Sequence, residues 1–176
     1  DLYGTFDDND LRKRHYITQE DGKYIFSKVS WGRDHWNEAC SVSDNFLFRT
    51  SEAYLNLAEA AAFDNDEGTA RQMIGLLQAK RYSTPPTIAE SGNALIDLIR
   101  EERQRELCLE GHRWYDLRRY TVCEKYPWSK TYRHTYTKFT TISYQTVPGE
   151  TRIYELGLND KAYTLTLPRE VLDFQV

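Results

Sequence analysis

The sequence predicts a mainly α-helical fold, built from tetratricopeptide-like helical hairpins of the α-α superhelix type, with irregular loops and a few short β-strands. Three observations support this prediction. Apolar residues recur at helical spacing through much of residues 45–120. Small residues fall where two antiparallel helices would meet. After residue 130 the helical spacing gives way to alternating Thr and Tyr, which is typical of extended strands.

The first 44 residues mix charge, Gly and Trp without helical periodicity. Within them, residues 22–31 (GKYIFSKVSW) place Tyr24, Phe26 and Lys28 on one side and Ile25 and Val29 on the other. This alternation predicts a short strand.

A helical hairpin is predicted over residues 45–82. Asp44 or Ser51 could cap its first helix, residues 64–68 (DNDEG) would form the turn, and the second helix would span 69–80. The positions that define the two helices share apolar or small side chains: Leu47, Tyr54, Leu57, Ala58, Ala61, Ala70, Ile74 and Leu77. Their spacing resembles a degenerate tetratricopeptide repeat, with an ordinary helical hairpin as the alternative. A single repeat cannot bury both faces, so further repeats are expected elsewhere in a longer parent chain.

Two more helices are predicted over residues 93–120. Pro85 and Pro86 must break the preceding helix, because each lacks a backbone donor and fixes φ. Ser91 or Asn93 could cap the next helix, Gly111 would end it or mark a bend, and a short helix would follow from 112 to about 120. The segment 121–170 is expected to be strands and loops, with a last strand at 162–168.

Several charges of the stretch 101–119 fall on the side of a predicted helix that should face the core. At 100° per residue, Arg103, Glu106 and Glu110 continue the apolar face that Ile96 and Ile99 begin. Either the helix leaves the core here, or these charges are buried and paired, for example with Arg49, Arg118 or Arg119. An unpaired buried charge costs several kcal/mol. We therefore expect Arg103 and at least one of Glu106 and Glu110 to be buried in ion pairs.

The composition argues against several functions. Charged residues make up 28% of the chain and the net charge is −4, whereas nucleic-acid-binding domains usually carry a strong basic excess. No apolar run approaches the roughly 20 residues of a membrane span. The cysteines and histidines show neither the spacing of a disulfide framework nor that of a metal site, and no cofactor is expected. These residues are Cys40, Cys108, Cys123, His15, His35, His112 and His134.

Four segments of the sequence resemble those of a known family. The stretch 98–120 (LIREERQRELCLEGHRWYDLRRY) is similar to the signature of the SusD/RagB family of Bacteroidetes outer-membrane lipoproteins. Residues 46–60, 7–17 and 163–172 resemble its upstream helix, its Asp-x-Arg stretch and its closing segment. The signature positions fall on Arg103, Glu106, Glu110, Gly111, Arg113, Asp116 and Arg118.

This resemblance implies binding rather than catalysis. Family members are lipid-anchored on the cell surface, where they capture starch or other polysaccharides, or sometimes peptides, for nutrient uptake. They pass this ligand to a SusC-type TonB-dependent outer-membrane transporter. Residues 1–176 would be the C-terminal portion of such a protein, with the N-terminal part absent. The lipid-bearing cysteine belongs to the start of the full protein, so none of the three cysteines is expected to carry it.

Candidate ligand-binding residues come from aromatic chemistry in loop-like sequence. Sugars stack on exposed Trp and Tyr rings, while nearby polar groups hold their hydroxyls. The alternative is that a loop Trp packs onto its own domain. Two clusters offer such rings: Trp31 with Trp36, and Tyr126 with Trp128 and Tyr132.

Two other classes of function stay open. A tetratricopeptide-type module would bind a peptide or protein on its concave face. A glycoside hydrolase would use two of Glu102, Glu106 and Glu110 as acid and base, with carboxylates about 5–10 Å apart across a cleft. Because all three emerge from one helix, they cannot easily flank a glycosidic bond, and no catalytic residue is assigned.

Overall fold

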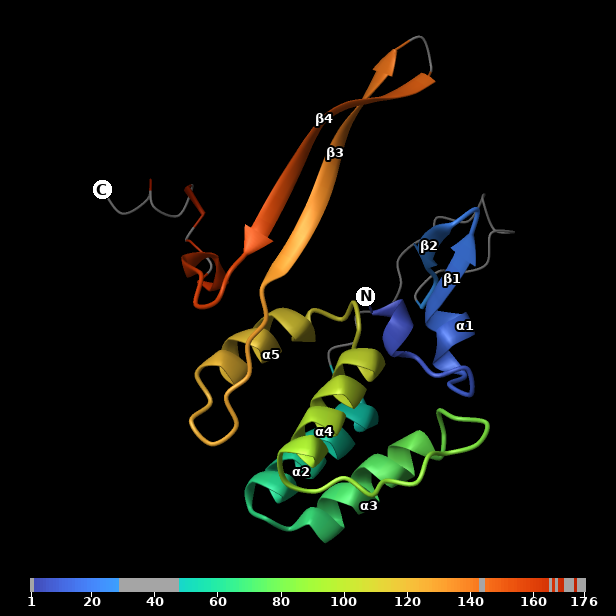
Figure 1. Cartoon of the computed structure of the whole chain (residues 1–176), viewed down its shortest axis with the longest axis vertical. Helices are drawn as coiled ribbons and strands as arrows, with labels where there is room; N and C mark the ends of the chain where they lie inside the picture. The colour runs from blue at the N-terminus through green and yellow to red at the C-terminus, as the bar shows by residue number, and fades with distance from the viewer. Residues whose placement is uncertain are drawn as a thin grey trace. The chain divides into compact units, whose positions relative to one another are not determined.

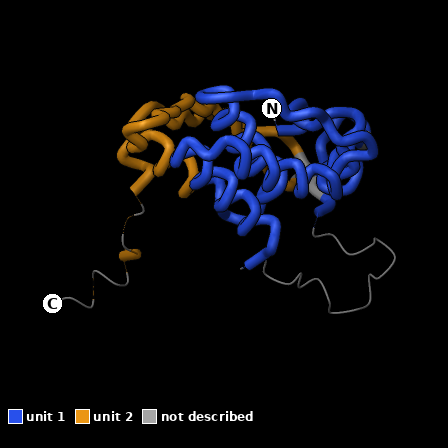
Figure 2. The backbone as a smooth tube through the Cα atoms, turned by 90° about the horizontal axis from the view of Figure 1, so that it is seen from below, with its two compact units in different colours: residues 1–113 blue, residues 114–176 orange. Residues whose placement is uncertain are grey.

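The computed structural model describes residues 2–28, 48–142 and 145–164, with positions 166, 168, 169 and 173 (Figure 1). The chain divides into two compact units, residues 1–113 and 114–176 (Figure 2). Candidate residues Trp31 and Trp36, and the expected cap Asp44, lie outside the described part. None of the helices in the described part is long and apolar enough to span a bilayer.

The N-terminal segment of unit 1 folds into short elements. A 3-10 turn precedes a small helix and a two-stranded antiparallel hairpin, whose turn residues Asp21 and Gly22 both have positive φ (50° and 73°). The strand expected within 22–31 is confirmed at its first part, whereas the helix was not predicted because five residues are too few to show a period. These elements are η1 (Tyr3–Thr5), α1 (Arg12–Tyr16), β1 (Ile17–Glu20) and β2 (Lys23–Phe26).

Three packed helices form the rest of unit 1. The helices α2 (Thr50–Phe63) and α3 (Glu67–Gln78) form a hairpin, and α4 (Gly92–Glu106) contacts both of them. Ala58 and Ala70 are fully buried, which lets the helix backbones approach closely. The core comprises chiefly Leu55, Ala58, Ala70, Ile74, Leu95, Ile96 and Ile99. A mainly helical fold with a helical hairpin is therefore confirmed.

The helix starts differ from the expected ones. α2 begins after Arg49, which makes no side-chain cap, and the expected cap Ser51 is buried inside the helix. α3 is capped by Asp66, whose carboxylate accepts a hydrogen bond of 3.0 Å from the Thr69 amide. Ser91 is at the N-cap of α4 but makes no side-chain cap bond.

Of the two roles expected for Gly111, the end of the helix or a bend, the structure shows the bend. The helix ends at Glu106, and Gly111 lies in the following turn with a φ of 84°, just before α5 (His112–Thr121). The carbonyl of Glu106 accepts hydrogen bonds from the side chains of Arg49 (2.8 Å) and Lys28 (2.6 Å). Side chains from elsewhere thus satisfy a carbonyl that a longer helix would have satisfied itself.

Unit 2 contains most of α5 and a long antiparallel hairpin of β3 (Tyr132–Ile142) and β4 (Gln145–Leu156) (Figure 1). The extended strands expected after residue 130 are confirmed by β3 and β4. The strand expected at 162–168 is wrong at its start, where a 3-10 helix (η2, Lys161–Tyr163) forms instead. Asp160 accepts a hydrogen bond of 2.8 Å from the Ala162 amide and so closes this turn.

Candidate functional site

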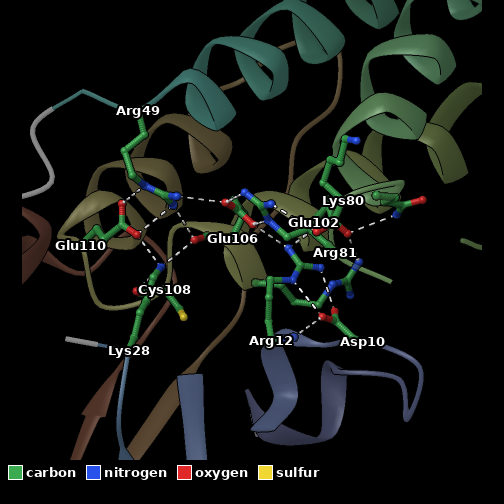
Figure 3. Close-up of polar contacts among 12 residues, drawn as sticks. Asp10, Arg12, Lys28, Arg49, Lys80, Arg81, Glu102, Glu106, Cys108 and Glu110 are labelled. Atoms are coloured by element: carbon green, nitrogen blue, oxygen red, sulfur yellow. Dashed lines mark hydrogen bonds and ion pairs between the residues drawn. The ribbon is translucent and has the colours of Figure 1, made fainter. Parts of the chain in front are cut away.

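The signature stretch lies at the centre of a buried ion-pair network in unit 1 (Figure 3). Three carboxylates, Glu102, Glu106 and Glu110, come from α4 and the turn after it. Their partners come from four other segments of unit 1 as well as from α4 itself. The network also includes Asp10, Arg12, Lys28, Arg49, Gln78, Arg81 and Arg105.

Glu106 is the centre of the network and is fully buried. Its two oxygens accept hydrogen bonds from Arg12 (2.9 Å), from Arg49 (3.0 Å) and twice from Arg81 (2.9 Å each). Burial raises the pKa of Glu106, but the hydrogen bonds and positive charges of the three arginines outweigh it and hold the pKa to about 2. This carboxylate is therefore charged throughout the physiological range.

Glu102 connects α4 to the N-terminal segment and to α3. Its Oε1 lies 2.7 Å from Nη1 of Arg12, and its Oε2 accepts from Gln78 (3.1 Å) and Arg105 (2.9 Å). Arg12 is held in turn by a bidentate pair with Asp10, at 2.9 and 2.7 Å. Burial raises the pKa of Glu102, but Arg12 and Arg105 outweigh it and lower the pKa overall.

Glu110 fixes the turn after α4. Arg49 donates to both of its oxygens at 2.9 Å, and Lys28 forms an ion pair with Oε1. The Lys28 ammonium also donates to the carbonyls of Glu106 (2.6 Å) and Cys108 (3.3 Å). The segments before α2 and after β2 are thus both tied to this turn.

The expected burial and pairing are confirmed for all three side chains. Arg103 is buried and turns toward α2, where it donates to Asn56 (2.7 Å) and lies 3.5 Å from Glu52. Glu106 and Glu110 are buried and paired as described above, with side-chain exposures of 0% and 2%. Of the partners suggested from the sequence, Arg49 is correct.

The last signature residues lie at or beyond the boundary of the two units. Arg113 is half-buried, and Asp116 is buried and pairs with Arg119 at 2.9 Å. Arg118 is exposed. Arg119 pairs on its own helix, and the suggested pairing of Arg118 or Arg119 with the α4 carboxylates, which belong to the other unit, stays a prediction.

Sequence reasoning missed several members of the network. Asp10, Arg12, Lys28 and Arg81 come from segments without helical periodicity or from the end of a helix, so phase could not select them. Signals did exist for three of the residues. Asp10 and Arg12 match the Asp-x-Arg pattern noted in residues 7–17, and Glu102 precedes Glu106 by one helical turn and shares its face.

The network is suited to holding a scaffold rather than to reacting. A general acid needs a proton near neutral pH, and the pKa of Glu106 lies far below that range. The oxygens of Glu102 and Glu110 are likewise engaged by buried cations. The catalytic interpretation of these carboxylates therefore loses its physical basis.

The described aromatic candidates lie in unit 2, after α5. Tyr126, Trp128 and Tyr132 are all half-buried. The Trp128 ring packs edge-on against Tyr120, with centroids 6.3 Å apart, and its amide donates to the Tyr120 carbonyl at 3.1 Å. Part of the Trp128 surface is thus used for packing, as the structural alternative expected, while the remainder is accessible.

Metal and disulfide chemistry find no support in the described residues. Among them, no group of three or more His, Cys, Asp or Glu side chains could hold a metal ion. Cys108 and Cys123 are free thiols, and Cys40 lies outside the described part. Burial raises the pKa of the Cys108 thiol, which makes it less reactive.

Fold and network together define a mainly helical scaffold in which buried ion pairs join an N-terminal segment to three packed helices. The SusD family model matches residues 4–157, and the chain belongs to this family. The match includes residues 121–157, where the sequence alone offered no recognisable motif. It also covers Asp10, Arg12 and the three carboxylates of the network.

A solved structure shows the same fold. It is described as a SusD-like carbohydrate binding protein from Bacteroides vulgatus ATCC 8482, with 22% identity and a TM-score of 0.61. The alignment covers 96% of this chain and 38% of that protein, so the chain spans well under half of its length. No curated protein matches the sequence.

Proposed function

We propose that this chain is part of a non-catalytic cell-surface glycan-binding lipoprotein. Such a protein captures an oligosaccharide or polysaccharide and passes it to a SusC-type TonB-dependent transporter in the outer membrane. The observation that carries this proposal is the family match over residues 4–157. The solved relative with the same fold is described as a carbohydrate binding protein, which supports a glycan as the ligand.

The similarity to the solved relative also indicates where residues 1–176 would lie in a longer protein. Because the chain spans 38% of its solved relative, we place residues 1–176 as the C-terminal portion of a larger SusD-like protein. The α2–α3 hairpin would be one tetratricopeptide-like repeat of that larger scaffold. The lipid anchor would lie outside this segment, so that membrane attachment does not involve its cysteines.

The ligand would be held by aromatic rings. Tyr126, Trp128 and Tyr132 are half-buried and retain accessible surface, and Trp31 and Trp36 are proposed as a second platform. An aromatic ring offers an apolar face to the C–H groups of a sugar, and polar neighbours bind its hydroxyls. Lysines accompany two of the rings, with Lys125 5.3 Å from the Tyr126 centroid and Lys130 5.7 Å from that of Tyr132.

A peptide-binding module of the tetratricopeptide type is the second candidate. It is favoured by Leu57 on α2 and Leu76 on α3, which are large apolar side chains exposed on the helical hairpin. Glycoside hydrolysis is the least favoured, because the buried carboxylates of α4 have lowered pKa values and are held in ion pairs.

Retention on immobilised neutral glycan tests the proposed function. Trp128→Ala and Tyr132→Ala should each lose retention, and Trp36→Ala should do so if the other platform is used. Tyr115→Ala is the matched control, because Tyr115 is an exposed aromatic residue on α5 of the same unit. Thermal melting of each variant separates loss of a contact from loss of folding. Unaltered retention by all three variants would reject the aromatic platforms.

The partner requires a separate experiment. The full-length protein should co-purify with a large β-barrel membrane protein under mild detergent. Recovery of a peptide-containing partner without any barrel protein would instead support the tetratricopeptide-type module.

A further inference from the structure

One face of the β3–β4 hairpin carries a hollow that none of the sites above uses. Its volume is about 150 Å³, which accommodates one six-membered ring. All of its lining comes from the two strands of unit 2. The lining residues are Tyr136, Lys138, Glu150, Arg152 and Tyr154.

The strand register explains why these side chains share a face. Tyr136 is paired with Arg152, and Tyr154 with His134, so these residues point to the same side of the hairpin. Between Thr137 and Phe139 the register shifts, so that Gly149 and Glu150 together lie opposite Lys138. Such a bulge bends the strand and increases its twist, which hollows the face.

Gly149 allows the strands to meet closely at this bulge. A Cβ atom at position 149 would lie 3.1 Å from the carbonyl oxygen of Lys138. Backbone geometry at the bulge therefore contributes to the shape of the hollow, together with the rotamers of the long side chains that line it.

The lining combines aromatic surface with an excess of positive charge. The rings of Tyr136 and Tyr154 lie 6.4 Å apart at 60°, and these residues are 48% and 53% exposed. Glu150 binds Arg152 through both oxygens, at 3.1 and 3.0 Å, which orients the guanidinium and neutralises the carboxylate. Lys138 has no ion-pair partner among the described residues, so the hollow presents two cations and one carboxylate.

We propose that this hollow is a subsite for an anionic sugar residue of a glycan chain. The sugar ring would stack on Tyr154, whose ring neighbours that of Tyr136, and its carboxylate or sulfate would pair with Lys138. This inference rests on the proposed function, because it assumes that the chain binds glycans. The chain as a whole carries a net charge of −4 and repels polyanions, so selectivity for an anionic sugar must come from this local arrangement.

Affinity electrophoresis in gels containing polygalacturonate, dextran sulfate or dextran tests the inference. The unaltered chain should be retarded more by at least one of the two polyanions than by neutral dextran. Lys138→Gln should weaken polyanion binding roughly three- to fivefold, as expected for one solvent-exposed ion pair. Tyr154→Ser should weaken it about fivefold through loss of the stacking surface. Retardation by polygalacturonate identifies a uronate carboxylate as the anion, and retardation by dextran sulfate alone identifies a sulfate ester.

Matched controls lie on the opposite face of the same strands. Arg133→Gln removes one exposed positive charge, and Ile153→Ser removes one exposed apolar side chain, without altering the lining of the hollow. Both control variants should bind the polyanion as the unaltered chain does. Equal weakening by Lys138→Gln and Arg133→Gln would show general charge attraction and overturn the inference. So would unchanged binding by Tyr154→Ser.

Binding of a neutral glycan distinguishes failure of the subsite from failure of the proposed function. If dextran or another neutral glycan is retained in a Trp128-dependent manner while polyanions are not preferred, the subsite is rejected and the proposed function stands. If neither neutral nor anionic glycans are retained, the proposed function and the subsite are both rejected.

Discussion

Replacing Glu106 with Gln is the sharpest test of the buried network. The substitution keeps the shape of the side chain but removes the charge that faces Arg12, Arg49 and Arg81. An amide has one oxygen instead of two, so two of the present hydrogen bonds would be replaced by a contact with an NH₂ group. The variant should therefore destabilise unit 1 without creating a cavity.

The size of the expected destabilisation depends on which ion pairs each of the three arginines keeps in the variant. Arg12 keeps its pairs with Asp10 and Glu102, and Arg49 keeps its bidentate pair with Glu110. Arg81 loses both of its hydrogen bonds to a carboxylate, but its side chain is 27% exposed and can be partly rehydrated. Breaking a buried pair costs about 3–5 kcal/mol, and this rehydration places the expected loss near the lower end, at about 3 kcal/mol.

Urea and thermal unfolding followed by far-UV circular dichroism measure this loss. The helical signal reports mainly on unit 1, because α1 to α4 all lie within residues 1–113. A loss of about 3 kcal/mol corresponds to a decrease in Tm of roughly 6–12 °C for a chain of this size. Glu101→Gln is the matched control, because Glu101 is on the same helix but 65% exposed, and it should change stability by less than about 0.5 kcal/mol.

Two results would refute this reasoning. A Glu106→Gln variant within about 1 kcal/mol of the unaltered chain would show that the network contributes little to folding. A Glu101→Gln variant with an equal loss would show that the effect belongs to helix charge in general and not to the buried position.

Two further predictions concern unit 1. Stability should be constant between about pH 5 and about pH 8 and should decrease in acid, because the pKa of Glu106 is near 2 in the folded chain and ordinarily 4.5, and that of Glu102 is also lowered. The folded state binds fewer protons than the unfolded state in this window, so protonation favours unfolding, and an unchanged urea midpoint at about pH 3 would contradict the prediction. Asp66→Ala should lower the free energy of unfolding by about 1 kcal/mol through loss of the α3 cap. Asp64→Ala, on the neighbouring exposed residue, should leave it unchanged in the same urea titration, and equal losses would show that capping is not the cause.

Periodicity was informative where helices are long. The expected hairpin over 45–82 is observed as α2 and α3. Of the apolar positions that defined it, Ala70, Ile74 and Leu77 are buried, whereas Leu57 is exposed. A helical rotation of 100° per residue also placed Arg103, Glu106 and Glu110 toward the core, and the structure confirms that their side chains are buried. A helix of several turns repeats its pattern often enough to be recognised.

Periodicity failed for short elements and for helix ends. α1 is only five residues long, and η2 replaces part of an expected strand because Asp160 closes a local turn. The end of α4 at Glu106 is set by side chains of Arg49 and Lys28 that bind its carbonyl. These residues are 57 and 78 positions away in sequence, beyond the reach of any local pattern.

The candidate ligand residues were chosen from residue type, and the structure adds information about some of them. It shows that Trp128 packs in part on Tyr120 and that Tyr126 and Tyr132 are half-buried, while Trp31 and Trp36 lie outside the described residues. Their role in binding stays a prediction. The hollow on the β3–β4 hairpin could not be found from sequence, because it depends on cross-strand register and on a bulge.

The order of the amino acids was enough to predict the family, the long helices and the fact that charges occupy a core-facing stripe of α4. These properties are local, since they arise from the spacing of neighbouring residues along the chain. The cations that neutralise that stripe are known from the three-dimensional packing, because they reach it from separate segments. They are Arg12, Lys28, Arg49 and Arg81. A buried charge requires a partner but does not specify which one, and that choice is made when the segments pack together.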